Sequence, residues 1–265
     1  MGRGFIIAWK DRGIFVSYLS TDGAAYIDVW KHQRVLGSKY QLVFMDLAGH
    51  GQSTTSRECY TMQSYAQDLQ TVVQELNITN IILIGWSLGG AVILEAEHLL
   101  RERLIGLVGI DTLELRSDEF SEPESSVYFQ CSPEEIARTL THFRTNFPEP
   151  FLTFYKSFLT AKMDSKDVAD LLATIKDNDQ RALLSALEEL MKWDLPKPLK
   201  ELQKPLRLIM AGEENYNAPG IRAEFDKYFS AVVFMENVKH MLFWDEPSKF
   251  NVLLEEQIQQ LLGEA

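Results

Sequence analysis

Short runs of apolar residues alternate along the chain with amphipathic stretches of helical spacing. A strand that is covered on both faces is apolar throughout, so runs of this kind are typical of a buried parallel sheet. The clearest of them, Ile81–Ile84, contains only isoleucine and leucine. The predicted strands are Phe5–Trp9, Gly13–Tyr18, Gln41–Met45, Asn80–Ile84, Leu104–Ile110, Leu206–Met210 and Ala231–Met235.

Helical patterns lie between these strands. In the last of them Phe250, Leu254 and Ile258 follow one another at spacings of four residues and therefore share one face. Strands that alternate with helices predict an α/β fold, in which helices flank a mostly parallel sheet. The predicted helices are Ala24–Leu36, Ser64–Leu76, Leu88–Leu100, Ile221–Phe229 and Pro247–Leu262.

The alternation stops between residues 113 and 198, where helical patterns occur without a convincing strand. Ser132-Pro133-Glu134-Glu135 is typical of a helix start, with a hydroxyl N-cap, a proline in the first turn and a carboxylate three residues after the cap. We interpret residues 113–198 as a helical lid, or cap, inserted into an α/β core that consists of residues 1–112 and 199–265.

Aromatic residues recur in this insertion at helical spacing. Phe151, Phe154, Tyr155 and Phe158 share one face of a predicted helix. Such a face either packs the lid onto the core or lines an apolar substrate pocket. For the pocket we single out Phe151, Phe154 and Phe158.

Composition and charge exclude several classes of partner. The chain has 265 residues, of which 46% are hydrophobic and 24% charged, as in an ordinary globular protein. Its formal net charge of −12 disfavours nucleic acids and anionic membranes, because phosphates repel such a surface. The two cysteines form no metal-ligand or disulfide pattern, and the apolar run Phe5–Trp9 is too short for a secretory signal. These features favour a cytoplasmic protein without a membrane span. The expected small-molecule partner follows from the motifs below and not from the charge.

The strongest local signal is Gly85-Trp86-Ser87-Leu88-Gly89-Gly90, which follows a predicted strand and opens a predicted helix. This is the context of a G-x-S-x-G nucleophile elbow, a sharp turn that exposes a serine above the sheet. The turn crowds the serine backbone, which explains glycine two residues away on both sides. At a helix N-terminus, backbone N–H groups and the helix dipole stabilise an oxyanion.

Two further segments extend this signal to a family resemblance. Asp46-Leu47-Ala48-Gly49-His50-Gly51-Gln52-Ser53 is similar to the D-x-x-G-H-G-x-S turn of the α/β-hydrolase superfamily, and Val238-Lys239-His240-Met241-Leu242-Phe243 resembles its late histidine loop. The resemblance covers most of the chain from about residue 13 and implies a lid-containing serine hydrolase. It implies that Ser87 is the nucleophile and His240 the general base, and that His50 is structural.

The acid of the expected triad has several candidates. Many members of the superfamily carry it in a G-x-x-D pattern, but here the corresponding segment, Gly212-Glu213-Glu214-Asn215, ends in an amide. An amide holds the imidazole without stabilising an imidazolium by charge. We favour Asp111, which closes the strand Leu104–Ile110, because some relatives with helical lids place their acid there. Glu213 and Glu214 are the alternatives.

The oxyanion hole is the second departure from the family pattern. Leu88, the residue after the nucleophile, supplies one expected backbone N–H. The other normally follows a His-Gly pair, for which this sequence has Ser17-Tyr18, so that Leu19 is the candidate donor. Tyr18 in place of glycine restricts the backbone. Tyr18 and Trp86 are also candidates for the lining of the substrate pocket.

Two functions remain open from the sequence. The first is a serine hydrolase that cleaves carboxylic esters or thioesters through an acyl-enzyme, without a metal or an organic cofactor. The second is a catalytically weak member of the fold that binds a small ligand or signals, which the altered oxyanion loop and Asn215 favour. The presence of both Ser87 and His240 favours the hydrolase.

Overall fold

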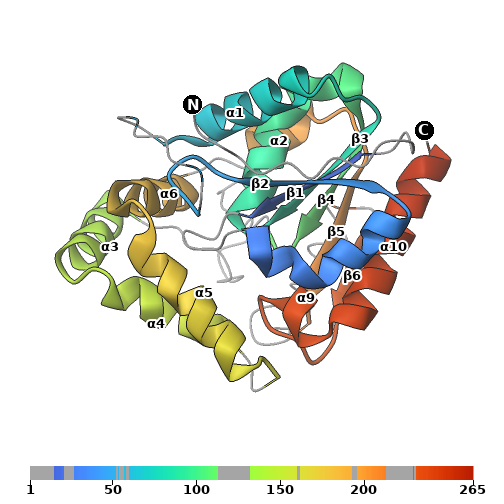
Figure 1. Cartoon of the computed structure of the whole chain (residues 1–265). Helices are drawn as coiled ribbons and strands as arrows, with labels where there is room; N and C mark the ends of the chain where they lie inside the picture. Colours follow the sequence, from blue (N-terminus) through green and yellow to red (C-terminus); the bar gives the residue numbers. More distant parts are fainter. Residues whose placement is uncertain are drawn as a thin grey trace.

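A parallel sheet forms the centre of the protein (Figure 1). The computed structural model describes residues 15–20, 27–51, 53, 57, 60–112, 132–159, 162–192, 196–212, 229 and 231–264. Its strands are β1 (Phe15–Ser20), β2 (Gln41–Asp46), β3 (Ile81–Trp86), β4 (Leu104–Ile110), β5 (Leu206–Ala211) and β6 (Val232–Met235).

The order of the strands places β3 and β4 in the middle of the sheet. The order is β2-β1-β3-β4-β5-β6, and all neighbouring pairs are parallel. The carboxyl ends of all strands therefore lie at one edge of the sheet, where ligands bind in open α/β folds.

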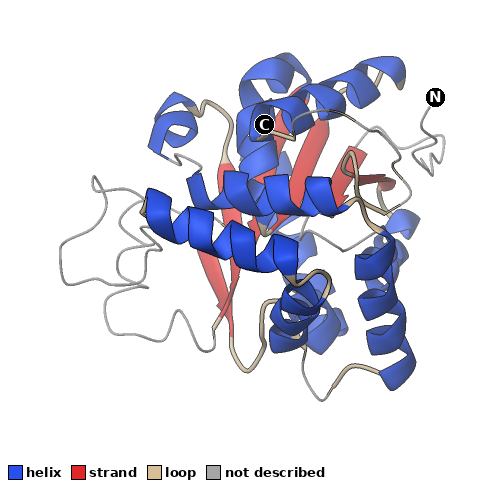
Figure 2. Ribbon diagram, turned by 90° about the vertical axis from the view of Figure 1, so that its left-hand side faces the viewer, coloured by secondary structure: helices blue, strands red, loops and turns tan. Residues whose placement is uncertain are grey.

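Helices cover both faces of this sheet (Figure 2). In chain order they are η1 (Ile27–Ser38, a 3₁₀ helix), α1 (Met62–Glu75), α2 (Leu88–Leu100), η2 (Arg101–Arg103, a 3₁₀ helix), α9 (Leu242–Asp245) and α10 (Pro247–Glu264).

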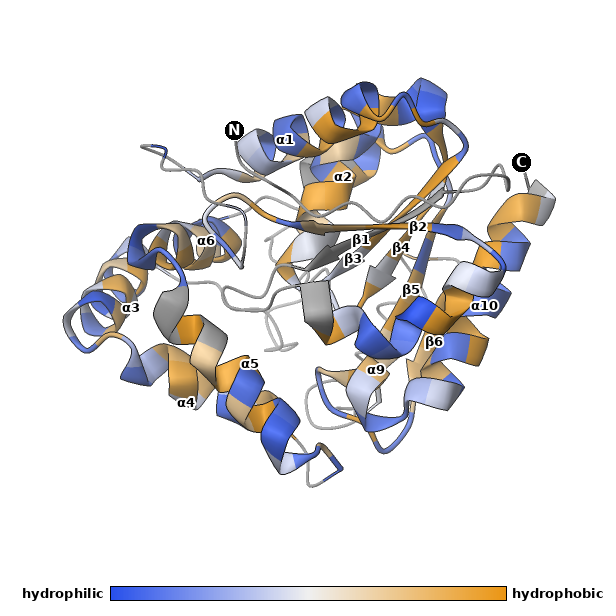
Figure 3. Ribbon diagram, viewed as in Figure 1, coloured by the Kyte–Doolittle hydropathy of each residue, from blue (hydrophilic) through white to orange (hydrophobic). Residues whose placement is uncertain are grey.

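The side chains of β3 explain why both faces are covered. Ile81 and Leu83 belong to the hydrophobic cluster beneath α1 and α2, whereas Ile82 and Ile84 belong to the cluster beneath η1, α9 and α10. All four are fully buried. Alternate residues of a strand point to opposite faces, so a continuous apolar run fits a strand between two layers of helices. Helix α10 shows bands of both polarities in Figure 3, as a helix with one face on the core does.

A group of helices follows β4 and precedes β5. They are α3 (Pro133–Thr145), α4 (Glu149–Phe158), α5 (Ser165–Asp177), α6 (Gln180–Lys192) and α7 (Pro196–Glu201). Helices α3 to α6 lie beside the sheet rather than on its faces (Figure 1), and they have a hydrophobic cluster of their own. Helix α3 begins with the predicted cap: Ser132 accepts from the backbone N–H of Glu135, and the Glu135 side chain accepts from the N–H of Ser132.

Most of the predicted elements within the described residues are confirmed. The strand Leu104–Ile110 and the helix Leu88–Leu100 have the predicted bounds. The early helix is present over Ile27–Ser38 as a 3₁₀ helix. The predicted strand Phe5–Trp9 and nearly all of the predicted helix Ile221–Phe229 lie outside the described residues.

Several predicted boundaries are displaced by one to three residues, and the difference in β1 bears on the site. The strand expected to end at Tyr18 continues to Ser20, in register with β2 on one side and, as far as Leu19, with β3 on the other. The segment Ser17-Tyr18-Leu19 is therefore part of the sheet and not the start of a loop. The apolar pattern after Gly13 ends near Tyr18, whereas the pairing of β1 with β2 continues to Ser20.

Candidate active site

Ser87 lies at the sharp turn between β3 and α2. Its φ of 53° and ψ of −124° lie in a region that side-chain-bearing residues rarely adopt, which is a mark of local strain at functional sites. Two hydrogen bonds hold the turn: the Ser87 N–H donates to the carbonyl of Ile110 over 3.0 Å, and the Ser87 carbonyl accepts from the Gly90 N–H over 2.9 Å. A Cβ atom at Gly85 would lie 2.2 Å from the carbonyl oxygen of Gly89, so a side chain does not fit there. The local geometry is that of a nucleophile elbow.

Thr112 braces the same turn and was missed by sequence reasoning. Its hydroxyl donates to the carbonyl oxygen of Ser87. A Cβ atom at Gly90 would lie 2.1 Å from the Thr112 Oγ1, so the second glycine of the pair makes room for this threonine. The repeated glycine after the G-x-S-x-G motif was the available signal, but the sequence does not indicate which side chain fills the space.

Asp111 directly follows β4, and hydrogen bonds hold both its backbone and its side chain. Its N–H donates to the carbonyl of Ile209 over 2.8 Å, and its Oδ1 accepts from the N–H of Ala211 over 2.9 Å. Its φ of 39° is positive, and the side chain is only 4% exposed. A buried carboxylate in this position needs a second partner for its other oxygen.

His240 is that partner. The loop between β6 and α9 carries it, and its Nδ1 lies 2.6 Å from Oδ2 of Asp111. An ionised carboxylate only accepts, so we assign the Nδ1 proton to the imidazole, which leaves Nε2 as the basic nitrogen. The His240 side chain is 19% exposed and Ser87 is partly exposed, so solvent reaches both, whereas Asp111 is buried.

Two further contacts fix the His240 loop. The indole N–H of Trp86, next to Ser87 in the chain, donates to the His240 carbonyl over 3.0 Å. The buried carboxylate of Asp245 accepts from the N–H of Lys239 over 2.7 Å. The residue after β4 therefore contacts the imidazole of His240, while residues of β3 and α9 contact the backbone of its loop.

The aromatic residues of the inserted helices lie in different surroundings. Phe158 has its ring centroid 4.5 Å from that of His240, and it packs against the core as well as against the insertion. Phe151 is buried in the cluster of the insertion itself, where its ring contacts Phe143. Phe154 is 39% exposed and packs on Phe158. Among these positions, Phe158 is the one placed against His240.

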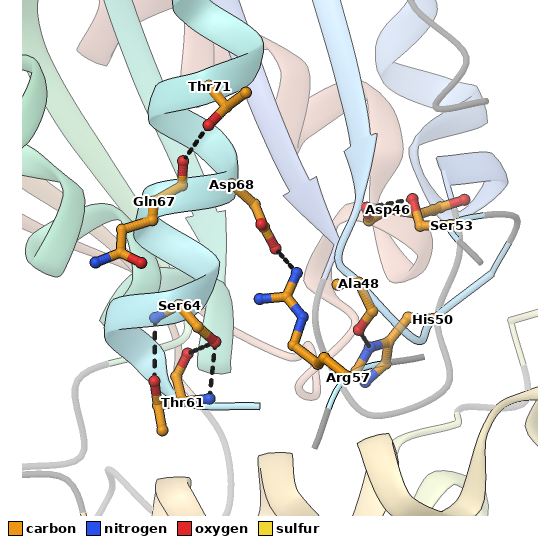
Figure 4. A network of polar contacts seen from close by, with 10 residues as sticks. All are labelled: Asp46, Ala48, His50, Ser53, Arg57, Thr61, Ser64, Gln67, Asp68 and Thr71. Carbon is orange, nitrogen blue, oxygen red and sulfur yellow. Dashed lines mark hydrogen bonds and ion pairs between the residues drawn. The ribbon is translucent and has the colours of Figure 1, made fainter. Parts of the chain in front are cut away.

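His50 belongs to a separate polar network (Figure 4). It is fully buried, and its Nδ1 donates to the carbonyl of Ala48 over 3.0 Å. Burial lowers the pKa of His50 to about 4, so the ring is neutral at physiological pH. An ion pair between Arg57 and Asp68 ties the chain after this loop to α1.

The remaining candidates from the sequence are the alternative acids, the two oxyanion donors and Tyr18. Glu213 and Glu214, the alternative acids, lie outside the described residues, as does the side chain of Tyr18. The backbone of Leu19 lies within β1, in register with Gly85. Leu88 is the first residue of α2, so its N–H has no partner within the helix.

The described residues contain neither a metal-binding cluster nor a membrane-spanning helix. Within the described ranges, no three His, Cys, Asp or Glu side chains form a group that could hold a metal ion. Nor is any helix there long and apolar enough to cross a membrane.

Comparison with known proteins identifies the family. A family model described as alpha/beta hydrolase fold matches residues 23–247. The chain belongs to the α/β-hydrolase family. It is thus an α/β hydrolase with esterase-like relatives, of which a pimeloyl-[acyl-carrier protein] methyl ester esterase from Nitrosospira multiformis is 25% identical over 82% of this chain and 84% of the relative.

A second relative and two solved structures agree with this assignment. An AB hydrolase superfamily protein from Bacillus subtilis is 24% identical over 81% of this α/β hydrolase and 80% of the relative. An esterase from Exiguobacterium antarcticum has a TM-score of 0.79 at 18% identity, covering 97% of this chain and 94% of its own. A thermophilic esterase from Thermogutta terrifontis has a TM-score of 0.75 at 20% identity, covering 94% and 90%. At these identities the solved structures show the shared fold.

Proposed function

We propose that this α/β hydrolase cleaves small carboxylic esters or thioesters, with Ser87 as nucleophile, His240 as general base and Asp111 as the acid that orients it. The contact of 2.6 Å between Asp111 Oδ2 and His240 Nδ1 carries the proposal. A buried carboxylate on the imidazole, beside a serine on a strained turn, is the arrangement that activates a hydroxyl.

In the first half of the reaction, the Ser87 Oγ attacks the carbonyl carbon of the ester while its proton passes to Nε2 of His240. The carbonyl oxygen becomes an oxyanion, which the N–H of Leu88 at the start of α2 stabilises. The bond to the leaving alcohol or thiol then breaks, and the leaving group takes the proton from His240. Asp111 stays ionised throughout and stabilises the imidazolium.

In the second half, water replaces the leaving group. His240 accepts a proton from the water, whose oxygen attacks the acyl carbon, and returns it to Ser87 as the acid is released. All bonds are made and broken among substrate, water and these side chains. The proposal therefore requires no oxidant, metal or organic cofactor.

The surroundings of His240 favour an apolar substrate. The ring centroid of Phe158 lies 4.5 Å from that of the His240 imidazole, so an apolar group of a substrate bound next to His240 would meet this ring. We assign residues 113–198, which contain α3 to α6, the role of a lid over this position. The second oxyanion donor, for which Leu19 is the candidate from the sequence, and a cytoplasmic location stay predictions. The relative from Nitrosospira multiformis is named for a methyl ester, in line with this substrate class.

The test is steady-state hydrolysis of p-nitrophenyl acetate, butyrate and octanoate by the purified chain. We expect turnover that falls by roughly 10⁴-fold or more in Ser87→Ala, because the nucleophile is lost. Ser157→Ala is the matched control, since this exposed hydroxyl on α4 only donates to the carbonyl of Phe154. A folded native chain without turnover above the buffer rate, on these esters and on the corresponding acyl thioesters, contradicts the proposal.

A further inference from the structure

Trp86 directly precedes the proposed nucleophile and contacts the proposed base, but its side chain belongs to the core rather than to the surface. It ends β3, pairs in register with Ile110 of β4 and directly precedes Ser87. Its side chain is fully buried, in a cluster with Trp30 and Phe243. Because Trp86 is fully buried, it can affect the site through its contacts with other residues rather than by touching the substrate.

The contacts of Trp86 lead to His240. The indole Nε1–H donates to the His240 carbonyl over 3.0 Å, across 154 positions of sequence. The indole and imidazole ring centroids are 5.1 Å apart with an interplanar angle of 42°. The ring of Phe243, three residues further along the same loop and helix, meets the indole edge-to-face at 5.0 Å. The same side chain thus fixes the backbone of His240 and supports its ring.

This link matters because the sheet alone fixes the histidine loop weakly. Strand β6 has four residues and forms the edge of the described sheet, and His240 follows it by five positions. Asp111 holds only the imidazole Nδ1, so the imidazole can still move with its backbone. The indole that donates this hydrogen bond belongs to the residue before Ser87. The side chain that holds the His240 backbone is therefore one peptide bond away from the proposed nucleophile.

We propose that Trp86 is a positioning residue that sets the distance and direction of the His240 imidazole relative to Ser87, an inference that rests on the proposed function. Its indole N–H is the decisive group, and the ring supports it. This role differs from the lining of a substrate pocket, because it predicts a loss in the chemical step rather than in substrate binding.

Trp86→Phe removes the N–H and keeps an aromatic ring. We expect kcat for p-nitrophenyl butyrate to fall by roughly 10- to 100-fold, since a displacement of about 1 Å in a reacting group costs this much. KM should change little, because the lost interaction acts on the base and not on the bound ester. We expect the Nδ1 proton of His240 to resonate far downfield in the NMR spectrum of the native chain, because it lies in the short contact with Asp111. In Trp86→Phe this resonance should shift or broaden, because the bond to Asp111 is misaligned.

Trp244→Phe is the matched control. Trp244 lies four residues after His240, and its indole N–H donates to a backbone carbonyl, that of Val29, over 2.6 Å. The two variants therefore lose the same kind of bond from the same region. We expect Trp244→Phe to keep the native kcat and the native Nδ1 proton resonance of His240.

The outcomes separate the two proposals. If Ser87→Ala hydrolyses esters as fast as the native chain, the proposed function fails, whereas the NMR comparison still tests the placement of His240. If Ser87→Ala is inactive but Trp86→Phe matches Trp244→Phe in kcat and in the NMR spectrum, the positioning role is overturned. A loss in Trp86→Phe that lies wholly in KM also overturns it. Should Trp86→Phe fail to fold, benzothienylalanine at position 86 alone replaces the N–H by sulfur in a ring of nearly the same shape.

Discussion

Asp111→Asn tests whether the carboxylate of Asp111 orients His240 as the base of Ser87. In the native chain the two carboxylate oxygens have separate partners: Oδ1 accepts from the Ala211 N–H over 2.9 Å, and Oδ2 meets His240 Nδ1 at 2.6 Å. An amide satisfies the first partner with its oxygen. Its NH₂ group then faces the Nδ1–H of His240, so that two donors oppose each other.

The two donors no longer oppose each other if the imidazole carries its proton on Nε2 instead of Nδ1. Nε2 is the nitrogen that, in the proposed mechanism, accepts the proton of Ser87. A change of tautomer of this kind lowers kcat by about 10⁴, which corresponds to about 5 kcal/mol of transition-state stabilisation. Since the substrate does not touch Asp111, KM should stay near the native value. The assay is hydrolysis of p-nitrophenyl butyrate, with the folded state of each variant checked by circular dichroism.

Asp245→Asn is the matched control. Asp245 is likewise a buried aspartate beside the histidine loop, but its carboxylate accepts from a backbone N–H, that of Lys239, over 2.7 Å. An amide oxygen accepts the same bond, so we expect a loss of less than about tenfold in kcat. If Asp111→Asn also stays within about tenfold of the native rate, the reasoning is refuted. A large loss in Glu213→Gln or Glu214→Gln instead would transfer the role of the acid to that residue.

Three further substitutions test the surroundings of the site. Gly90→Ala should abolish hydrolysis or folding, because its Cβ would lie 2.1 Å from Thr112 Oγ1. Gly90→Ala with Thr112→Ala, which removes both Oγ1 and the methyl group of the threonine, should restore part of the thermal stability. Phe158→Ala should shift the preference among acetate, butyrate and octanoate esters by roughly 10-fold, as expected for a change of an apolar pocket, and an unchanged ratio of kcat/KM values would remove Phe158 from the pocket. His50 has its pKa lowered from 6.5 to about 4 by burial, so as pH falls through this window the unfolded chain binds a proton that the native chain does not, and roughly 3 kcal/mol of stability is lost. Urea unfolding at several pH values should show a shallower loss in His50→Gln than in the native chain; equal slopes would contradict the burial argument.

The strand and helix pattern was predictable because burial leaves a direct mark on the sequence. The run Ile81–Ile84 is apolar at every position since helices cover both faces of β3. The helix start at Ser132 was also predictable, because the capping hydroxyl, Pro133 and Glu135 lie within one turn of the chain. The end of β1 was not predictable, because no local pattern after Tyr18 shows that the pairing with β2 continues to Ser20. Register with distant strands is not encoded locally.

The site was predictable where motifs are local and unpredictable where contacts are long-range. The elbow around Ser87 follows from the glycines beside it and from its place between a strand and a helix. The choice of Asp111 over the other candidate acids remained open in the sequence, since it depends on which strand end meets the histidine loop. Nothing in the sequence pointed to the bonds of Thr112 and Trp86, because each joins a side chain to a backbone carbonyl far away in the chain.

The most direct test of the central claim is reaction of the folded chain with a fluorophosphonate, followed by intact mass measurement and peptide mapping. An activated Ser87 predicts one adduct per chain on the peptide that contains Ser87. It also predicts loss of the adduct in Ser87→Ala and much slower labelling in Asp111→Asn. A folded native chain that stays unlabelled, or an adduct that persists in Ser87→Ala, would contradict the assignment of Ser87 as the nucleophile.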